Sequence, residues 1–80
     1  MSKYQEMEQV VVVRIPTPGS TLGTVVSHPE GPKVGDLGTV VDVQSRSGEP
    51  PIYTVEAFDM NGQTKWLAIF DEIDLDACNS

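Results

Sequence analysis

His28 is the one histidine of the 80-residue chain and the first candidate for acid–base or metal chemistry. It precedes Pro29 in a turn-rich stretch, and Glu30 is the only carboxylate near it in the sequence. A general base needs a positioned partner, and a zinc site needs several nitrogen or sulfur ligands. The sequence provides neither next to His28, so we expect a solvated loop histidine.

Asp71, Glu72, Asp74 and Asp76 form the second candidate, a run of carboxylates that could bind a divalent cation. Hard oxygen ligands suit calcium, but a calcium-binding loop also needs a glycine for its turn and a bidentate glutamate at a fixed spacing. The run has neither, so an exposed acidic edge is the better interpretation. We therefore predict no metal site and no cofactor.

Nucleophilic and phosphate-binding chemistry is poorly supported as well. No sequence motif places a histidine base next to the candidate nucleophiles Ser20, Ser45 and Ser47. A serine hydroxyl without a base to deprotonate it is a poor nucleophile. Cys78 is the only cysteine, which excludes an intrachain disulfide and a thiolate metal site. The sequence contains neither a P-loop nor a dinucleotide-binding glycine motif. We predict that the protein is not an enzyme.

The composition indicates one small acidic domain. A chain of 80 residues, 39% of them hydrophobic, can form a single core. Twelve acidic and five basic residues give a net charge of −7, which repels a phosphate backbone, so no nucleic acid is expected as a partner. Residues 1–9 lack the apolar run of a signal peptide, and no stretch is long enough to span a membrane. These features predict a cytoplasmic protein that does not contact a membrane.

The elements that would position any site are β-strands. The stretch 33–43 is central, because a Gly-Asp turn leads into a β-branched run typical of a twisted strand. Gly38 lies inside that run, where a chain bends or admits a close neighbour. The sequence Leu-Gly-Thr-Val-Val at 37–41 also occurs at 22–26, which suggests two similar strands that could be neighbours. Residues 27–33 would form the turn between them.

Residues 9–15 form another predicted strand, because four consecutive valines suit a pleated surface, and Pro16 ends it. If Arg14 faces water, the two-residue period of a strand turns the odd-numbered residues toward the core. Two apolar side chains, Val10 and Val12, then point outward together with the arginine. These two valines would need another apolar surface to shield them from water.

Residues 44–51 are polar and end in two prolines, which is typical of a surface loop. A hairpin is predicted after this loop, with strands at 52–58 and 64–70 and a turn at 59–63 that contains Asn-Gly. Residues 71–76 are predicted to form a short turn or a one-turn helix. In that element Asp71 would be the N-cap, and Ile73 and Leu75 would pack into one open end of the predicted β-domain.

The strand 64–70 is apolar on both faces, since Leu67 and Ile69 lie opposite the face that carries Trp66. Such a strand is buried on both faces, and in so small a domain the second cover often comes from another chain. We therefore predict a homo-oligomer. Its candidate interface consists of the outward apolar side chains of two strands, Val10, Val12, Leu67 and Ile69.

Tyr53 and Trp66 allow two interpretations. As functional residues, they would form an aromatic groove of the kind that binds polyproline ligands. As structural residues, they would pack across the hairpin in the core. The positions of both residues along their strands favour the interpretation that they are core residues. Tyr53 and Trp66 are kept as the candidate residues of a ligand groove.

Two motifs in the chain can be compared with known patterns. Residues 35–41 read Gly-Asp-Leu-Gly-Thr-Val-Val, residues 53–58 read Tyr-Thr-Val-Glu-Ala-Phe, and a turn ending in Gly62 follows. With these motifs the chain resembles, over residues 9–76, a family of small bacterial proteins of unknown function. The resemblance implies an SH3-like barrel and supplies no catalytic residues. A looser similarity to KOW-type modules, which contact RNA, fits the acidic turns poorly.

The chain departs from the family pattern at two places. Residues 21–33 are extra material, including the second Leu-Gly-Thr-Val-Val, and Ala57 occupies the expected aromatic position while Phe58 follows it. We predict an all-β fold, a small SH3-like barrel of about five antiparallel strands over residues 9–76. Flexible ends are predicted at residues 1–8 and 77–80.

The function predicted from these observations is that of a non-catalytic interaction or assembly module that self-associates. The alternative is an acidic protein that neutralises a basic partner, in the manner of immunity proteins and antitoxins. The first prediction depends on surplus apolar strand surface, and the second depends on the charge of −7.

Overall fold

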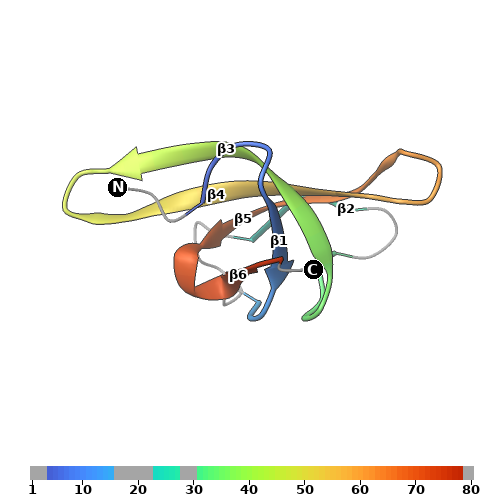
Figure 1. Cartoon of the computed structure of the whole chain (residues 1–80), viewed down its shortest axis with the longest axis horizontal. Helices are drawn as coiled ribbons and strands as arrows, with labels where there is room; N and C mark the ends of the chain where they lie inside the picture. The colour runs from blue at the N-terminus through green and yellow to red at the C-terminus, as the bar shows by residue number, and fades with distance from the viewer. Residues whose placement is uncertain (1–3, 16–22, 28–30, 79–80) are drawn as a thin grey trace.

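One antiparallel sheet contains all the strands of the described part of the chain (Figure 1). The computed structural model describes residues 4–15, 23–27 and 31–78. The strand order is β2-β5-β4-β3-β1-β6, which confirms the all-β prediction. A short 3-10 turn, η1 (Glu72–Asp74), precedes the last strand. The strands are β1 (Gln9–Val12), β2 (Gly23–Ser27), β3 (Leu37–Arg46), β4 (Glu49–Phe58), β5 (Thr64–Asp71) and β6 (Leu75–Ala77).

The sheet curls but does not close. β1 pairs with β3 on one side and with β6 on the other, so the two ends of the domain meet at one edge. The opposite edge is β2, which pairs with β5. Among the described residues no ladder joins β2 to β6. This topology is consistent with an open SH3-like barrel.

The strand phase that favoured Tyr53 and Trp66 as core residues agrees with the observed burial. Tyr53, Val55 and Ala57 are buried on β4, and Trp66 is buried on β5 with every second residue after it. The Trp66 and Phe70 rings meet edge to face, with their centroids 5.9 Å apart. Burial alternates with the two-residue period of a strand from Tyr53 to Ala57 and from Trp66 to Phe70.

The face predicted for β1 is wrong. Val10 and Val12 are fully buried, whereas Val13 and Ile15 are exposed. β1 ends at Val12, and the Arg14 N–H donates to the Asp74 carbonyl oxygen instead of continuing a strand ladder. The direction of Arg14 therefore does not set the phase of β1.

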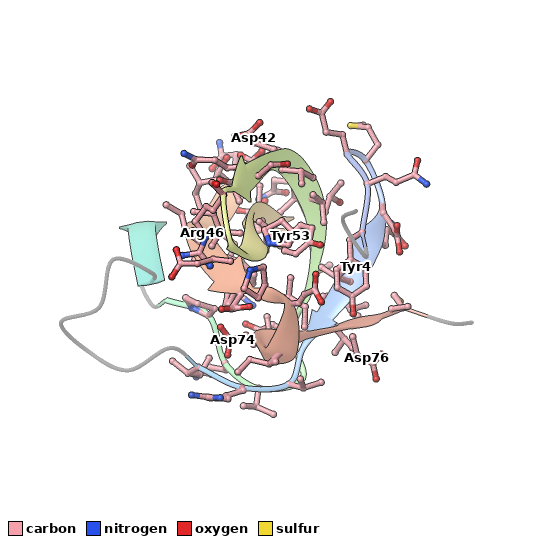
Figure 2. All side chains as sticks on the ribbon, turned by 90° about the vertical axis from the view of Figure 1, so that its left-hand side faces the viewer. Tyr4, Asp42, Arg46, Tyr53, Asp74 and Asp76 are labelled. Carbon is pink, nitrogen blue, oxygen red and sulfur yellow. The ribbon has the colours of Figure 1, made fainter. Side chains whose placement is uncertain are left out.

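The N-terminal segment contributes to the core, although residues 1–8 were predicted to lie outside the domain. Tyr4 is buried, and its hydroxyl donates to the Leu75 carbonyl oxygen at 3.1 Å. Its ring packs edge to face on Tyr53, with the centroids 5.3 Å apart (Figure 2). At the other end of the chain, Ala77 pairs with Val10 in the ladder between β1 and β6.

The predicted loop at 44–51 is instead the end of a long hairpin. β3 runs to Arg46, β4 starts at Glu49, and Gly48 adopts a φ of +73° in the turn between them. Pro50 and Pro51 coincide with a shift of register between β3 and β4. A strand tolerates proline at such an irregularity because no ladder hydrogen bond is lost there.

The second hairpin is confirmed in its turn as well as in its strands. The Asp59 N–H donates to the Gln63 carbonyl oxygen at 2.8 Å, and the Asp59 side chain accepts from the Asn61 and Gln63 amides. Gly62 takes the left-handed conformation, with a φ of +81°. Local turn chemistry alone explains this element.

The repeated Leu-Gly-Thr-Val-Val segments are not neighbours in the sheet. Residues 23–27 form β2 at one edge, and two other strands separate β2 from β3. The repeat reflects shared strand composition rather than pairing.

The C-terminal element is one turn long, as predicted, but its buried residues differ from the expected pair. Leu75 is buried and Ile73 is exposed. Asp74 takes the inner position, and one of its carboxylate oxygens, Oδ2, accepts from the Asp71 amide at 3.0 Å (Figure 2).

Candidate functional site

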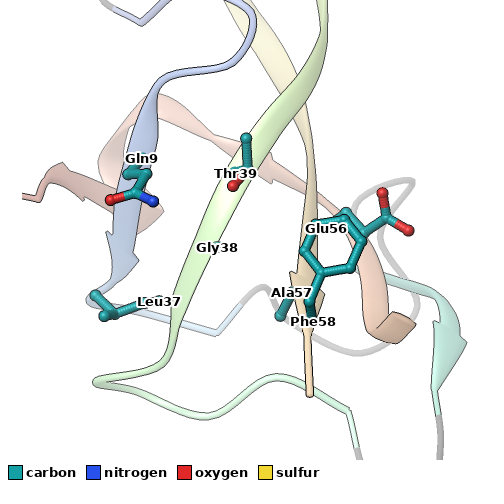
Figure 3. Close-up of a pocket in the computed structure, with 7 residues that line it drawn as sticks. All are labelled: Gln9, Leu37, Gly38, Thr39, Glu56, Ala57 and Phe58. Carbon is teal, nitrogen blue, oxygen red and sulfur yellow. The ribbon is translucent and has the colours of Figure 1, made fainter. Parts of the chain in front are cut away.

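The outer face of the sheet carries a hollow where β3 and β4 separate (Figure 3). Thr39 and Glu56 face each other as a pair of the ladder. Beyond this pair, Gly38 is opposite Val10 of β1 and Ala57 is opposite Trp66 of β5. The hollow has a volume of about 170 Å³. Its lining comes from three strands: Gln9, Leu37, Gly38, Thr39, Glu56, Ala57 and Phe58.

Gly38 is at the base of the hollow because no other residue fits there. A Cβ atom at this position would lie 2.5 Å from Val55 Cγ1 and 3.3 Å from both the Glu56 carbonyl oxygen and Trp66 Cη2. The missing side chain brings β3 down onto the core and leaves space above it. The sequence indicated such a close neighbour at Gly38, and the structure identifies it as Val55 and Trp66.

Two exposed apolar side chains flank the hollow. Leu37 is 60% exposed and Phe58 is 52% exposed. They lie on diverging strands, so neither covers the other. Single exposed apolar residues are ordinary on a protein surface, and here two of them border the same depression.

The polar groups of the hollow comprise one carboxylate, one amide and one hydroxyl. The Thr64 hydroxyl donates to Oε2 of Glu56, which holds this carboxylate against the outer face of β4. Gln9 and Thr39 provide the amide and the hydroxyl. Glu56 is the single ionisable side chain of the lining, so the hollow has a negative charge.

The predicted interface residues do not form one surface. Val10 and Val12 point into the core, whereas Leu67 and Ile69 are half-buried on the outer face of β5. Leu67 is opposite Glu56 across the ladder, so the outer face of β5 borders the hollow. Only two of the four predicted residues are therefore available to a partner.

Tyr53 and Trp66 are core residues with fully buried side chains. Trp66 Nε1 donates to Oδ2 of Asp36 at 3.1 Å, and the Tyr53 hydroxyl donates to Oε2 of Glu72 at 3.3 Å. They present no open aromatic groove, which agrees with the interpretation that strand phase favoured.

The structure describes only some of the predicted chemical candidates. His28 and Ser20 lie outside the described residues. In the acidic run, Asp74 pairs with Arg14, whose Nε lies 3.6 Å from Oδ1, while Asp76 is exposed. Within the ranges that the structure describes, no three His, Cys, Asp or Glu side chains gather where they could hold a metal ion.

No known family, curated protein or solved structure matches this chain. Among the residues that the structure describes, none belong to a helix with the length and apolar character needed to cross a bilayer.

The hollow itself was not predicted from the sequence. The sequence analysis treated Leu37 and Phe58 only as parts of motifs. One signal was present: Ala57 occupies the position where the family pattern has an aromatic residue, and Phe58 follows one position later. A displacement of one residue moves a side chain to the other face of a strand. The structure shows this result, with Ala57 buried and Phe58 exposed.

Proposed function

We propose that the protein is a non-catalytic protein-interaction module that binds through the outer face of its sheet. The observation that carries this proposal is the hollow between Leu37 and Phe58, two exposed apolar side chains on diverging strands. Glu56 is the only ionisable group in the lining, and acid–base or nucleophilic catalysis needs at least a pair of cooperating groups. The chemistry of the lining therefore suits recognition.

Self-association is the first mode of action that we propose. Leu67 and Ile69 continue the apolar surface from the hollow onto β5, and a second copy could cover them. Cys78 is a free thiol, which fits a reducing compartment, so the proposed place of action is the cytoplasm.

Light scattering during size exclusion tests self-association directly. We expect a mass above that of the 8.7 kDa monomer when the protein concentration is tens of micromolar. A small apolar interface gives a dissociation constant on the order of micromolar, so the oligomer should be populated at that concentration. The double substitution Leu67→Thr/Ile69→Thr places a β-branched side chain, which suits a strand, at both positions and should give the monomer mass. Val41→Thr, at an exposed position of β3, is the matched control and should not change the mass. A monomer for the unsubstituted chain would reject this mode.

Binding of a basic partner is the second candidate function. Twelve acidic groups stand against five basic ones in the sequence, and the described part of the chain holds both arginines in ion pairs. Arg14 pairs with Asp74, and the guanidinium of Arg46 lies 3.5 Å from Glu49 and 3.9 Å from Asp71. Both arginines are thus held against carboxylates of their own chain, and the formal net charge of −7 leaves the surface with an excess of acidic groups.

The salt dependence of binding tests the second candidate. A partner recovered by the immobilised protein should be basic, and its affinity should fall by about tenfold or more between 50 and 300 mM salt, because the attraction is between exposed charges. Binding that does not change with salt would reject charge recognition.

A further inference from the structure

We propose that the hollow between β3 and β4 binds an arginine side chain from an extended segment of a basic partner. This inference rests on the second candidate function, to which it adds a specific site and a specific ligand group. It combines three observations: the volume of the hollow, the arrangement of its polar and apolar groups, and the charge of the chain.

The volume suits a guanidinium group. A space of 170 Å³ corresponds to roughly five molecules of liquid water. A guanidinium has four heavy atoms in one plane, so it fits without displacing any wall of the hollow. Gly38 has no side chain and the Ala57 side chain is buried, so neither residue fills the space at its base.

The groups of the hollow match the different parts of an arginine side chain. Glu56 would accept the guanidinium N–H groups, since Thr64 engages Oε2 and the described residues give Oε1 no hydrogen bond. Phe58 lies two residues further along β4 and offers an exposed ring to a cation (Figure 3). Leu37 would contact the apolar stem, because arginine buries its methylene groups along apolar surface.

Arginine fits this arrangement better than lysine does. Its planar group donates several hydrogen bonds at once and stacks on aromatic rings, whereas an ammonium acts as a compact, strongly hydrated charge. Glu56, Thr39 and Gln9 all belong to the lining and carry oxygen atoms that can accept hydrogen bonds. Several acceptors around one site favour the ligand with more donors.

The charge of the chain argues for a separate basic partner as the occupant. A second copy would bring a further −7, and its Arg14 and Arg46 are already held by carboxylates of its own chain. An anionic ligand would be repelled by Glu56 and by the whole domain. A basic segment gains attraction both at the hollow and from the surrounding surface.

The test is a titration of the full chain with blocked five-residue peptides, Gly-Ser-Arg-Ser-Gly and the same peptide with glutamine or lysine in the centre. Amide chemical shifts report where each peptide binds. For the arginine peptide we expect saturable shifts at the lining residues, with a dissociation constant on the order of 1 mM. The glutamine peptide should give no saturable shifts, and the lysine peptide should bind at least threefold more weakly.

Two substitutions with a matched control separate the hollow from general charge attraction. Glu56→Gln keeps an acceptor oxygen for the Thr64 hydroxyl, so the fold should persist while the affinity for the arginine peptide falls about tenfold. Phe58→Leu keeps an apolar side chain but removes the ring, and should weaken binding about threefold. Asp42→Asn removes one exposed carboxylate elsewhere on β3 and should leave the affinity within twofold.

Several outcomes would overturn the inference. Shifts spread over the whole acidic surface, or equal losses in Glu56→Gln and Asp42→Asn, would show charge attraction without a site. In that case the interaction function stands and the assignment of the hollow fails. No binding of the arginine peptide, together with salt-sensitive binding of a basic protein, would also reject only the hollow. If the chain is a monomer and recovers no basic protein, the proposed function fails as well.

Discussion

Gly38→Ala is expected to lower the free energy of unfolding by about 3 kcal/mol, the upper range for an overpacked core. The new Cβ would stand 2.5 Å from Val55 Cγ1, which is shorter than any ordinary carbon contact. Val55 and Trp66 are both fully buried, so neither can move without shifting the core. A domain of this size has a total stability of about 4–12 kcal/mol, so the loss is large. Urea denaturation followed by tryptophan fluorescence measures it.

The substitution Val55→Ala in the Gly38→Ala background identifies the clash. Val55→Ala alone should cost about 2 kcal/mol, because it removes buried methyl groups. In the double variant the same truncation makes room for the new Cβ, so the combined loss should be smaller than the sum by more than about 1 kcal/mol. Additive losses would contradict the proposed contact.

Gly48→Ala is the control for the backbone effect of adding a side chain to glycine. Gly48 has a φ of +73°, and a Cβ there would meet no atom within 4 Å. The substitution should cost about 1 kcal/mol, because alanine is strained in a left-handed conformation. Gly38 has no positive φ, so a larger loss at Gly38 than at Gly48 comes from the contact with Val55 and Trp66 and not from backbone strain.

Asp74→Ala is expected to lower the free energy of unfolding by about 2–3 kcal/mol, because it leaves the half-buried Asp71 amide without its acceptor. Oδ2 of Asp74 accepts from the Asp71 amide at 3.0 Å at the start of η1. The Asp74 carbonyl oxygen accepts from the Val13 amide at 2.8 Å, so this residue also joins η1 to the end of β1. Thermal and urea unfolding measure the loss.

A graded series separates the hydrogen bond of Asp74 from its charge. Asp74→Asn keeps one acceptor oxygen and should cost about 1 kcal/mol or less. Arg14→Ala should change stability by less than about 1 kcal/mol, since this side chain is 56% exposed and its ion pair is screened by water. Asp76→Ala, at an exposed carboxylate in the same run, should be within about 0.5 kcal/mol of the unsubstituted chain. An equal cost at positions 74 and 76 would contradict the structural role of Asp74.

The buried Asp74 changes the interpretation of the acidic run. Among its four carboxylates, the structure assigns Asp74 to an internal hydrogen bond and Glu72 to the Tyr53 hydroxyl. Asp71 lies within 3.9 Å of Arg46. A run of like charges in the sequence is thus divided among separate partners, because a 3-10 turn directs successive side chains to different sides.

Elements determined by local chemistry could be predicted from the sequence. The turn at 59–63 needs only Asp59 and Gly62, and the buried face of β4 follows from the alternation of side chains along the strand. The close neighbour at Gly38 was also predicted, because a glycine within a β-branched run usually marks a bulge, a bend or the close approach of another segment. These features depend on residues a few positions apart.

Other elements depend on contacts between distant parts of the chain. The phase of β1 is set by its pairing with β3 and β6 and by the bonds of Val13 and Arg14 to Asp74, about sixty residues away. The place of Tyr4 depends in the same way on Tyr53 and Leu75. No pattern within the N-terminal segment could indicate either.

The sequence by itself determined that this chain is an acidic all-β domain, that residues 59–63 form a hairpin turn and that Tyr53 and Trp66 belong to the core. Only the tertiary structure decided that Val10 and Val12 belong to the core and that Leu37 and Phe58 border a hollow. The physical reason is that alternation gives a strand two faces, whereas the strands packed beside and beneath it decide which face meets water.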